Sequence, residues 1–124
     1  MDDNAAIKGL VQDTMSSCYE YFGRLIPCLE KIIEGISDAP ENHLLNLSEA
    51  CDGIAWMTKA FFNTSNYYYI EIDYESVEKT LKNVCDGLKN RDYIFIAETL
   101  EYEMLPMLTK WFETLEKDFG DNKK

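Results

Sequence analysis

The sequence has little of what usually identifies a catalytic or metal-binding protein. Its 124 residues contain one histidine, six glycines and three prolines. The absence of a glycine-rich phosphate loop and of any C-x-x-C pair argues against P-loop nucleotide binding, zinc sites of that spacing and thioredoxin-like chemistry. No apolar run approaches the roughly 18 residues that span a bilayer. The acidic start, residues 1–4, lacks the basic and then apolar order of a signal peptide, so we expect a soluble, cytoplasmic protein.

Positive charge is also scarce. Lys and Arg number 12 against 23 Asp and Glu, so the formal net charge is −11. Nucleic acids and anionic membrane surfaces are bound by clusters of Lys and Arg, and we therefore expect neither as a partner. Apolar residues, by contrast, make up 46% of the chain. That share is too high for a disordered chain, and the length suits one domain with one core.

The cysteines and the histidine are best interpreted as structural residues. Cys18 and Cys28 fall at core-facing positions of a predicted helix, as expected for buried, reduced thiols. A catalytic cysteine needs a base such as histidine close by. His43 lies near the start of a helix, where we expect it to pack at the helix edge. The E-x-x-H motif of a di-iron bundle is missing too, and we predict no cofactor.

Apolar side chains recur at helical spacing in four segments, each with the wide stripe of a core-facing helix. The predicted core positions are Ile7, Val11, Thr14, Met15, Cys18, Tyr21, Phe22, Leu25, Cys28, Leu29, Ile32, Ile33 and Ile36; Leu44, Leu47, Cys51, Ile54, Ala55, Thr58, Phe61 and Phe62; Tyr74, Val77, Leu81, Val84 and Leu88; and Tyr93, Ala97, Leu100, Met104, Met107, Leu108, Trp111 and Leu115. We predict an all-α, up-down-up-down four-helix bundle. It forms a single domain over residues 1–119, followed by a disordered polar tail over 120–124.

Polar residues and prolines predict where these helices begin and bend. Asp38, Asp73 and Asp92 are expected to cap the second, third and fourth helices, and a glutamate three residues after Asp38 would complete a capping box. Pro27 and Pro106 lie inside the first and last helices. A proline ring clashes with the carbonyl four residues before it and lacks an N–H, so we expect a kink at each.

The connection at residues 67–72 has the composition of a strand, but the chain offers no second strand to pair with it. We therefore predict an ordered crossover between helices. Neighbouring side chains of an extended segment point to opposite sides. Tyr67, Tyr68 and Tyr69 cannot then all be buried, and at least one should lie at the surface.

Three further side chains do not fit the bundle pattern. At about 100° per residue, Trp56 points away from the apolar stripe of the second helix and Tyr102 away from that of the fourth. Tryptophan is enriched at binding hot spots, and nearby carboxylates favour a partner with Arg or Lys, or a helix with a basic rim. Glu101 is the reverse case. It falls at the edge of the stripe, where we expect a half-buried carboxylate bonded to a Tyr, Lys or Arg of a neighbouring helix.

An enzymatic alternative rests on paired carboxylates. Glu75 and Glu78, then Glu98 and Glu101, form an E-x-x-E pair on successive helices. Two such pairs can hold Mg²⁺, and the spacing resembles that of all-helical nucleotide pyrophosphohydrolases of the MazG type. In a hairpin that turns near residue 90, Glu78 and Glu101 can meet, but Glu75 lies about 12 Å along the axis from Glu98. One pair is not a metal cage, so this hydrolase is the alternative function and not the preferred one.

Residues 90–111, NRDYIFIAETLEYEMLPMLTKW, resemble the C-terminal signature DY-x-x-IA-D/E-x-LEYE-x-x-P-x-L-x-x-W of a family of small all-helical proteins and domains from Firmicutes. Residues 52–56, DGIAW, are similar to a second element of that family. Its members occur alone or appended to larger proteins, some linked to motility. The resemblance implies no activity, because none is assigned to the family. It does imply which residues occupy recurring positions: Trp56, Glu101, Tyr102 and Trp111.

The sequence therefore predicts a non-enzymatic protein-interaction module that binds a second copy or another protein through exposed aromatic side chains. The acidic surroundings favour a basic partner and speed its approach at low salt. The candidate interface residues are Trp56, Tyr67, Tyr68, Tyr69 and Tyr102.

Overall fold

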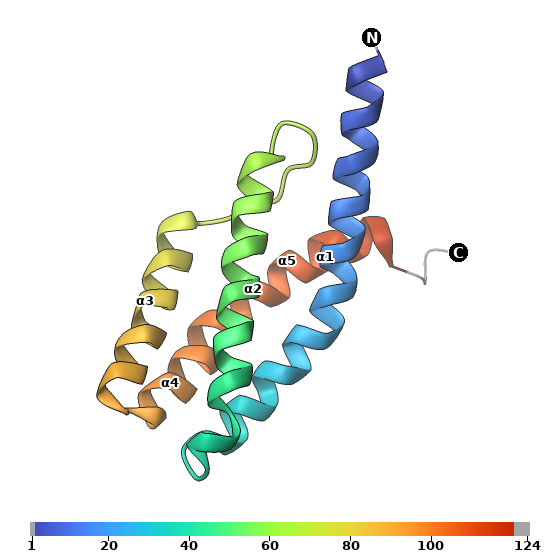
Figure 1. Cartoon of the computed structure of the whole chain (residues 1–124). Helices are drawn as coiled ribbons and strands as arrows, with labels where there is room; N and C mark the ends of the chain where they lie inside the picture. The colour runs from blue at the N-terminus through green and yellow to red at the C-terminus, as the bar shows by residue number, and fades with distance from the viewer. Residues whose placement is uncertain (1, 121–124) are drawn as a thin grey trace.

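The computed structural model describes residues 2–120, and this part of the chain is mostly helical (Figure 1). Its elements are α1 (Asp2–Gly35), the 3₁₀ turn η1 (Pro40–Asn42), α2 (Leu44–Asn63), α3 (Tyr74–Asn90), α4 (Tyr93–Thr99), the π-helical turn η2 (Leu100–Met104) and α5 (Leu105–Phe119). No residue in this range forms a strand, so the predicted all-α class is confirmed and the tyrosine-rich segment is a crossover. Residues 121–124 of the predicted tail lie outside the described range.

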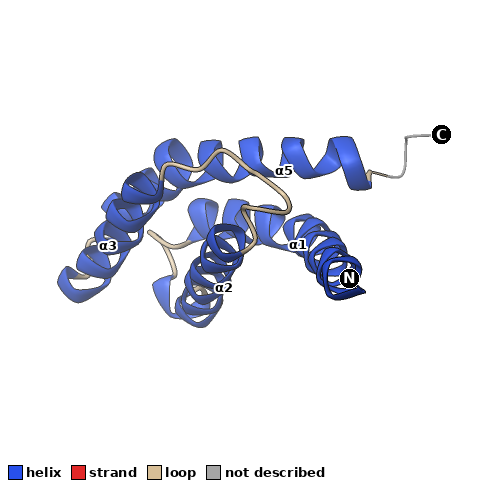
Figure 2. Cartoon of the chain, turned by 90° about the horizontal axis from the view of Figure 1, so that it is seen from above, coloured by secondary structure: helices blue, strands red, loops and turns tan. Residues whose placement is uncertain are grey.

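α4, η2 and α5 follow one another as one continuous rod, which is the fourth rod of the structure after α1, α2 and α3. Successive rods run in alternating directions and form a four-helix bundle (Figure 1). α1 packs against both α2 and α5, and α3 packs against α4. Seen from above, α5 crosses one side of the bundle while α2 lies on the opposite side (Figure 2). Within residues 2–120, no helix combines the length and the apolar character needed to cross a membrane.

The core lies along one face of α1, against which α2, α4 and α5 pack. The buried side chains of α1 are Val11, Met15, Cys18, Phe22, Leu25, Leu29, Ile32 and Ile36. From the opposite elements, Phe61 meets Trp111 edge-to-face with ring centroids 5.8 Å apart. The prediction for Ile7 is wrong, since its side chain is 37% exposed. The reason is that the first turns of α1 extend past the ends of the other helices, so they have nothing to pack against (Figure 1).

The connection from α1 to α2 differs from the prediction. Pro40 opens the single turn of η1, and α2 begins only at Leu44, after His43. Asp38 therefore caps no helix and the predicted capping box is wrong, because η1 separates this aspartate from the start of α2. His43 is half-buried against Gly35, where an added Cβ would collide with the imidazole ring. The histidine thus has the packing role at a helix edge that the sequence predicts.

The caps of the third and fourth predicted helices are confirmed. The Asp73 carboxylate accepts hydrogen bonds from the hydroxyl and the backbone N–H of Ser76, at 2.8 and 3.2 Å, and these bonds lower the pKa of Asp73. Asp92 accepts a bond from the backbone N–H of Phe95 at 3.1 Å. Between them, Arg91 has a φ of 56°, the left-handed conformation that commonly ends a helix. The α3–α4 hairpin is therefore defined by local bonds at both of its helix starts.

The two internal prolines affect the backbone differently. α1 continues through Pro27 as one helix and curves in its second half (Figure 1). Pro106 follows the π turn η2, in which the Leu105 N–H bonds to the Leu100 carbonyl five residues earlier. A wider turn leaves room for the proline ring beside the Tyr102 carbonyl, which an α-helical turn would not. The disturbance predicted at Pro106 thus takes the form of a π turn.

Candidate interaction surface

The apolar stripe of α2 is wider than the core requires. Its buried side chains are Leu47, Ala50, Ile54, Met57 and Phe61. Ala55 and Phe62, which the sequence places in the core, are exposed instead, and Thr58 is half-buried. The physical reason is that α2 packs on α1 whereas α3 packs on α4, so the edge of α2 that faces α3 stays partly open.

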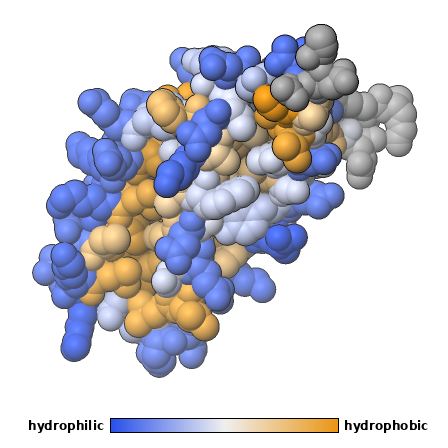
Figure 3. Space-filling model, turned by 45° about the horizontal axis from the view of Figure 1, so that its top comes forward, coloured by the Kyte–Doolittle hydropathy of each residue, from blue (hydrophilic) through white to orange (hydrophobic). Residues whose placement is uncertain are grey.

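An open groove of about 570 Å³ lies between α2 and α3. Its apolar and aromatic lining residues are Ala55, Phe62, Tyr74, Val77 and Leu81, and Thr58 lies among them. The Thr58 hydroxyl donates to the Ile54 carbonyl at 2.7 Å, so it brings no unsatisfied donor into the groove. Figure 3 shows apolar side chains gathered in a band between charged ones on the side of the molecule where α2 and α3 lie.

Aromatic side chains close one end of this groove. Phe62 is 64% exposed and meets Tyr74 edge-to-face, with ring centroids 5.5 Å apart. Burial and the nearby Tyr69 raise the pKa of the Tyr74 hydroxyl, and Tyr69 itself is 70% exposed. The crossover therefore contributes Tyr69 to the same surface as α2 and α3.

Charged side chains flank the groove. Glu75 and Glu78 lie on the α3 side and Lys59 on the α2 side, and all three are exposed. The lining thus carries two carboxylates against one amine, which matches the acidic balance of the whole chain. Exposed carboxylates beside an apolar channel attract cationic side chains of a partner.

The other two crossover tyrosines differ from Tyr69. The Tyr68 ring lies 6.0 Å from that of Phe119, and its hydroxyl donates to Asp118 at 2.6 Å. Burial and this bond to Asp118 raise the pKa of Tyr68. Tyr67 is 44% exposed. The prediction that the three tyrosines cannot all be buried is confirmed: Tyr68 attaches the crossover to α5, whereas Tyr67 and Tyr69 stay accessible.

Trp56 and Tyr102 are exposed as predicted, at 57% and 70%. Trp56 belongs to α2, the helix that forms one wall of the groove. Tyr102 belongs to η2, which packs against α1 and α3, and it does not line the groove. The predicted interface is therefore divided over three elements: Trp56 lies on α2, Tyr69 on the crossover and Tyr102 on η2.

The prediction of a half-buried carboxylate at Glu101 is wrong, because this side chain is exposed. Regular spacing still places Met104, Leu108 and Trp111 correctly in the core after the π turn. The error lies at the edge of the apolar stripe, where no neighbouring element covers Glu101. The carboxylate that reaches α3 is that of Glu103, which accepts a long 3.5 Å bond from the buried Thr80 hydroxyl. Glu78 lies at the groove instead. Within residues 2–120, no three His, Cys, Asp or Glu side chains gather as a metal site requires.

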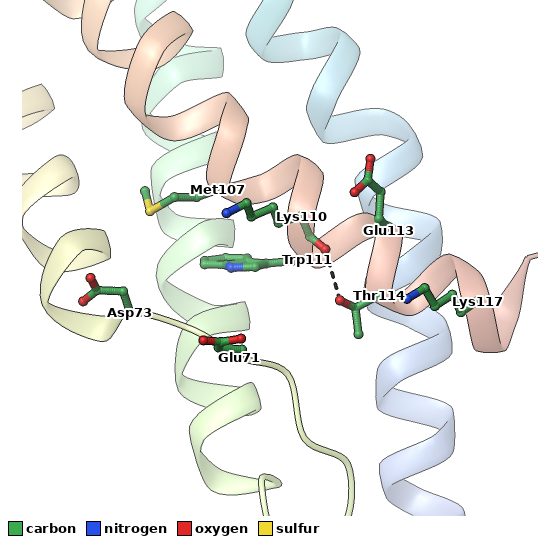
Figure 4. Close-up of a pocket in the computed structure, with 8 residues that line it drawn as sticks. All are labelled: Glu71, Asp73, Met107, Lys110, Trp111, Glu113, Thr114 and Lys117. Atoms are coloured by element: carbon green, nitrogen blue, oxygen red, sulfur yellow. Dashed lines mark hydrogen bonds between the residues drawn. The ribbon is translucent and has the colours of Figure 1, made fainter.

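A second hollow, of about 440 Å³, lies between the crossover and α5 (Figure 4). The indole of Trp111, a core residue that is 3% exposed, forms part of its wall. The charged side chains around it are Glu71, Asp73, Lys110, Glu113 and Lys117. The hydroxyl of Thr114 is bonded to the Lys110 carbonyl at 3.2 Å. With charges of both signs and no nucleophile beside a base, we interpret this hollow as the seam between the crossover and α5.

Two of the four cysteines, Cys18 and Cys51, have the properties of structural thiols. Cys18 is buried, Cys28 and Cys51 are half-buried and Cys85 is exposed, and all are free. Burial raises the pKa of Cys18 to about 11, and burial together with nearby Cys85 and Asp52 raises that of Cys51 to about 11. Thiols with such values stay protonated at neutral pH and are poor nucleophiles.

The comparisons with known proteins place these features in a family. Over residues 13–114 the chain matches a family model described as a domain of unknown function, DUF8042. That span includes α2, α3 and all of the predicted interface residues. No curated protein and no solved structure matches the chain. Because the match covers most of the sequence, the protein belongs to the DUF8042 family.

Proposed function

We propose that this domain acts by binding another protein through the apolar and aromatic surface around α2, and not by catalysis. The groove between α2 and α3 carries the proposal, with Phe62 at its end and Trp56 on the same helix, 64% and 57% exposed. Aromatic side chains dominate the binding energy of many interfaces, and their burial by a partner is favourable. The partner is a second copy or a different protein, and we expect it in the cytoplasm.

The resemblance to a recurring signature extends this proposal to relatives. Residues 52–56 and 90–111 contain Trp56 and Tyr102, two of the exposed aromatic residues. We propose that these segments recur in Firmicutes because their surfaces are used for contact. Tyr102 would then belong to a second contact surface, separate from the groove.

The native mass in solution, measured by light scattering at low and moderate salt, tests for self-association. Wild type is compared with Trp56→Ala and Phe62→Ser, both at exposed positions. A dimer that becomes a monomer in either variant supports self-association through this surface. A monomer in every case excludes it and leaves a different protein as the partner.

A thermal-shift measurement separates binding from hydrolysis. A Mg²⁺-dependent nucleotide hydrolase is stabilised by Mg²⁺ together with a nucleoside triphosphate, because a ligand that binds the folded state raises the melting temperature. We expect no rise beyond that caused by Mg²⁺ alone. A clear rise that Glu78→Gln and Glu101→Gln abolish would contradict the proposal and favour the hydrolase.

A further inference from the structure

We propose that the groove between α2 and α3 is the docking site for an amphipathic helix with basic flanks, supplied by another protein. This inference rests on the proposed function and specifies its site and the chemistry of its partner. It excludes Trp56 and Tyr102 from the primary contact, because neither lines the groove.

The backbone around the groove selects a helix over an extended peptide. Both walls are α-helices, whose N–H and C=O groups are already bonded within the helix. An extended peptide gains affinity by pairing with a sheet edge, and residues 2–120 contain no strand. A helix carries its own backbone bonds and needs only an apolar surface to pack on. The occupant that fits these walls is therefore helical.

The length and lining of the groove define the apolar face of that helix. The α2 wall runs from Ala55 to Phe62, which is about 11 Å at helical rise, or two turns. A partner helix covers this length with apolar side chains at positions i, i+3 or i+4, and i+7. Such a stripe would bury the exposed apolar surface of Phe62, Ala55 and the half-buried Leu81.

Charge decides between a second copy and a basic partner. Glu75 and Glu78 flank the groove with only Lys59 opposite them, and the chain carries a formal net charge of −11. Two copies meeting at this groove would bring their acidic rims together, which costs free energy. A helix with Lys or Arg beside its apolar stripe places cations next to these carboxylates instead. The occupant is therefore a basic amphipathic helix of another protein.

Three synthetic helical peptides of about 14 residues test this inference. The first has leucines at i, i+3, i+4 and i+7 with lysines on both flanks. The second has the same composition with its leucines spread around the helix, and the third keeps the leucine stripe but replaces each lysine with glutamate. Affinity is measured by fluorescence anisotropy, and the contact is mapped by backbone amide shifts. We expect the first peptide to bind at least about tenfold more tightly than the other two, with shifts along the groove.

Variants of exposed residues identify the groove. Ala55→Ser combined with Phe62→Ser, which removes apolar surface without changing the charge, should weaken the first peptide at least about tenfold. Glu75→Lys combined with Glu78→Lys should weaken the first peptide and allow the third to bind. Leu45→Ser removes an apolar side chain that is 72% exposed and lies outside the groove lining, and it should leave the affinity unchanged. Thermal melting confirms that each variant is folded.

Several results would overturn the inference. The first is equal affinity for the first two peptides, which would mean that charge alone drives binding. The others are no binding of the first peptide, or affinity unchanged by both groove variants. A wild-type dimer that Phe62→Ser converts to a monomer would assign the groove to a second copy. That result would reject the basic helix but keep the proposed protein-binding function, whereas a nucleotide-dependent thermal shift would reject the function itself.

Discussion

At the scale of single residues, one hydroxyl attaches the crossover to α5. Tyr68 donates to Asp118 at 2.6 Å while its ring packs beside Phe119. Tyr68→Phe keeps the ring and removes the bond, so we expect the free energy of unfolding in urea to fall by about 1 kcal/mol. Tyr67→Phe is the matched control, since this hydroxyl has no hydrogen-bond partner within residues 2–120. An equal loss in both variants would contradict the role of the Tyr68–Asp118 bond.

The same tyrosine makes stability depend on alkaline pH. Burial, then the bond to Asp118 and its negative charge, raise the pKa of Tyr68 in the folded protein. A raised pKa contributes stability that is fully present below the unfolded value of about 10 and is lost as pH rises through the folded value. We therefore expect the urea midpoint to fall above pH ~10, and to fall less steeply in Tyr68→Phe. Parallel curves for the two proteins would show that Tyr68 does not contribute.

Some residue positions follow from the sequence and others do not. Trp56 is exposed because it lies opposite the α2 stripe, and this direction does not depend on which helix packs against α2. Asp73 and Asp92 cap because their bonds are local. Glu101 was misplaced because it lies at the edge of the apolar stripe, where periodicity gives the direction of a side chain but not whether another element covers it. The π turn itself was not predicted, although the missing N–H of Pro106 makes an α-helical turn there unfavourable.

At the scale of elements, α3 and α4 approach so closely that only glycine fits between them. A Cβ on the buried Gly87 would lie 2.6 Å from Cγ1 of Ile96, a side chain held inside the core. We expect Gly87→Ala to lower the free energy of unfolding by about 1–2 kcal/mol, since overpacking outweighs the better helix propensity of alanine. Gly23→Ala is the control, because nothing lies within 4 Å of a Cβ there. It should stabilise α1 by about 0.5–1 kcal/mol, and two effects of the same sign would contradict this account.

Helix starts provide a second matched pair. Asp92 accepts a bond from the Phe95 N–H at the start of α4, whereas Asp38 caps no helix. Asp92→Ala should therefore cost about 1 kcal/mol of unfolding free energy in chemical denaturation. Asp38→Ala, which removes the same charge, should be close to neutral. A comparable loss at Asp38 would mean that η1 depends on this carboxylate after all.

Helix order and the crossover are predictable at this scale, but the partner of each helix face is not. The apolar residues of α2 form one broad stripe in the sequence, and periodicity gives their directions. It does not say that Ile54 and Phe61 are buried in the core while Ala55 and Phe62 line an open groove. That division arises because α3 packs on α4 rather than on α2, which depends on long-range packing. The sequence pattern therefore did not predict the groove, although it identified its apolar residues.

At the scale of the whole molecule, the excess of negative charge has two opposite consequences. With a formal net charge of −11 on 124 residues, carboxylates repel one another in the folded chain more than in the expanded one. The same field attracts a cationic partner toward Glu75 and Glu78. Salt screens both effects, so it should stabilise the fold while it weakens the proposed contact.

Salt titration checks both consequences in one sample. Raising the ionic strength from about 0.01 to about 0.1 M shortens the Debye length from about 30 to about 10 Å, and we expect the melting temperature to rise by a few degrees. Near pH 4.4, where the net charge vanishes, this rise should disappear. A melting temperature that is unchanged or falls with salt at pH ~7 would contradict self-repulsion. The protein is expected to be more stable at the higher salt. Weaker binding of a lysine-flanked peptide at that salt therefore cannot result from unfolding. It results from the screening of the attraction between the peptide and the carboxylates of the protein.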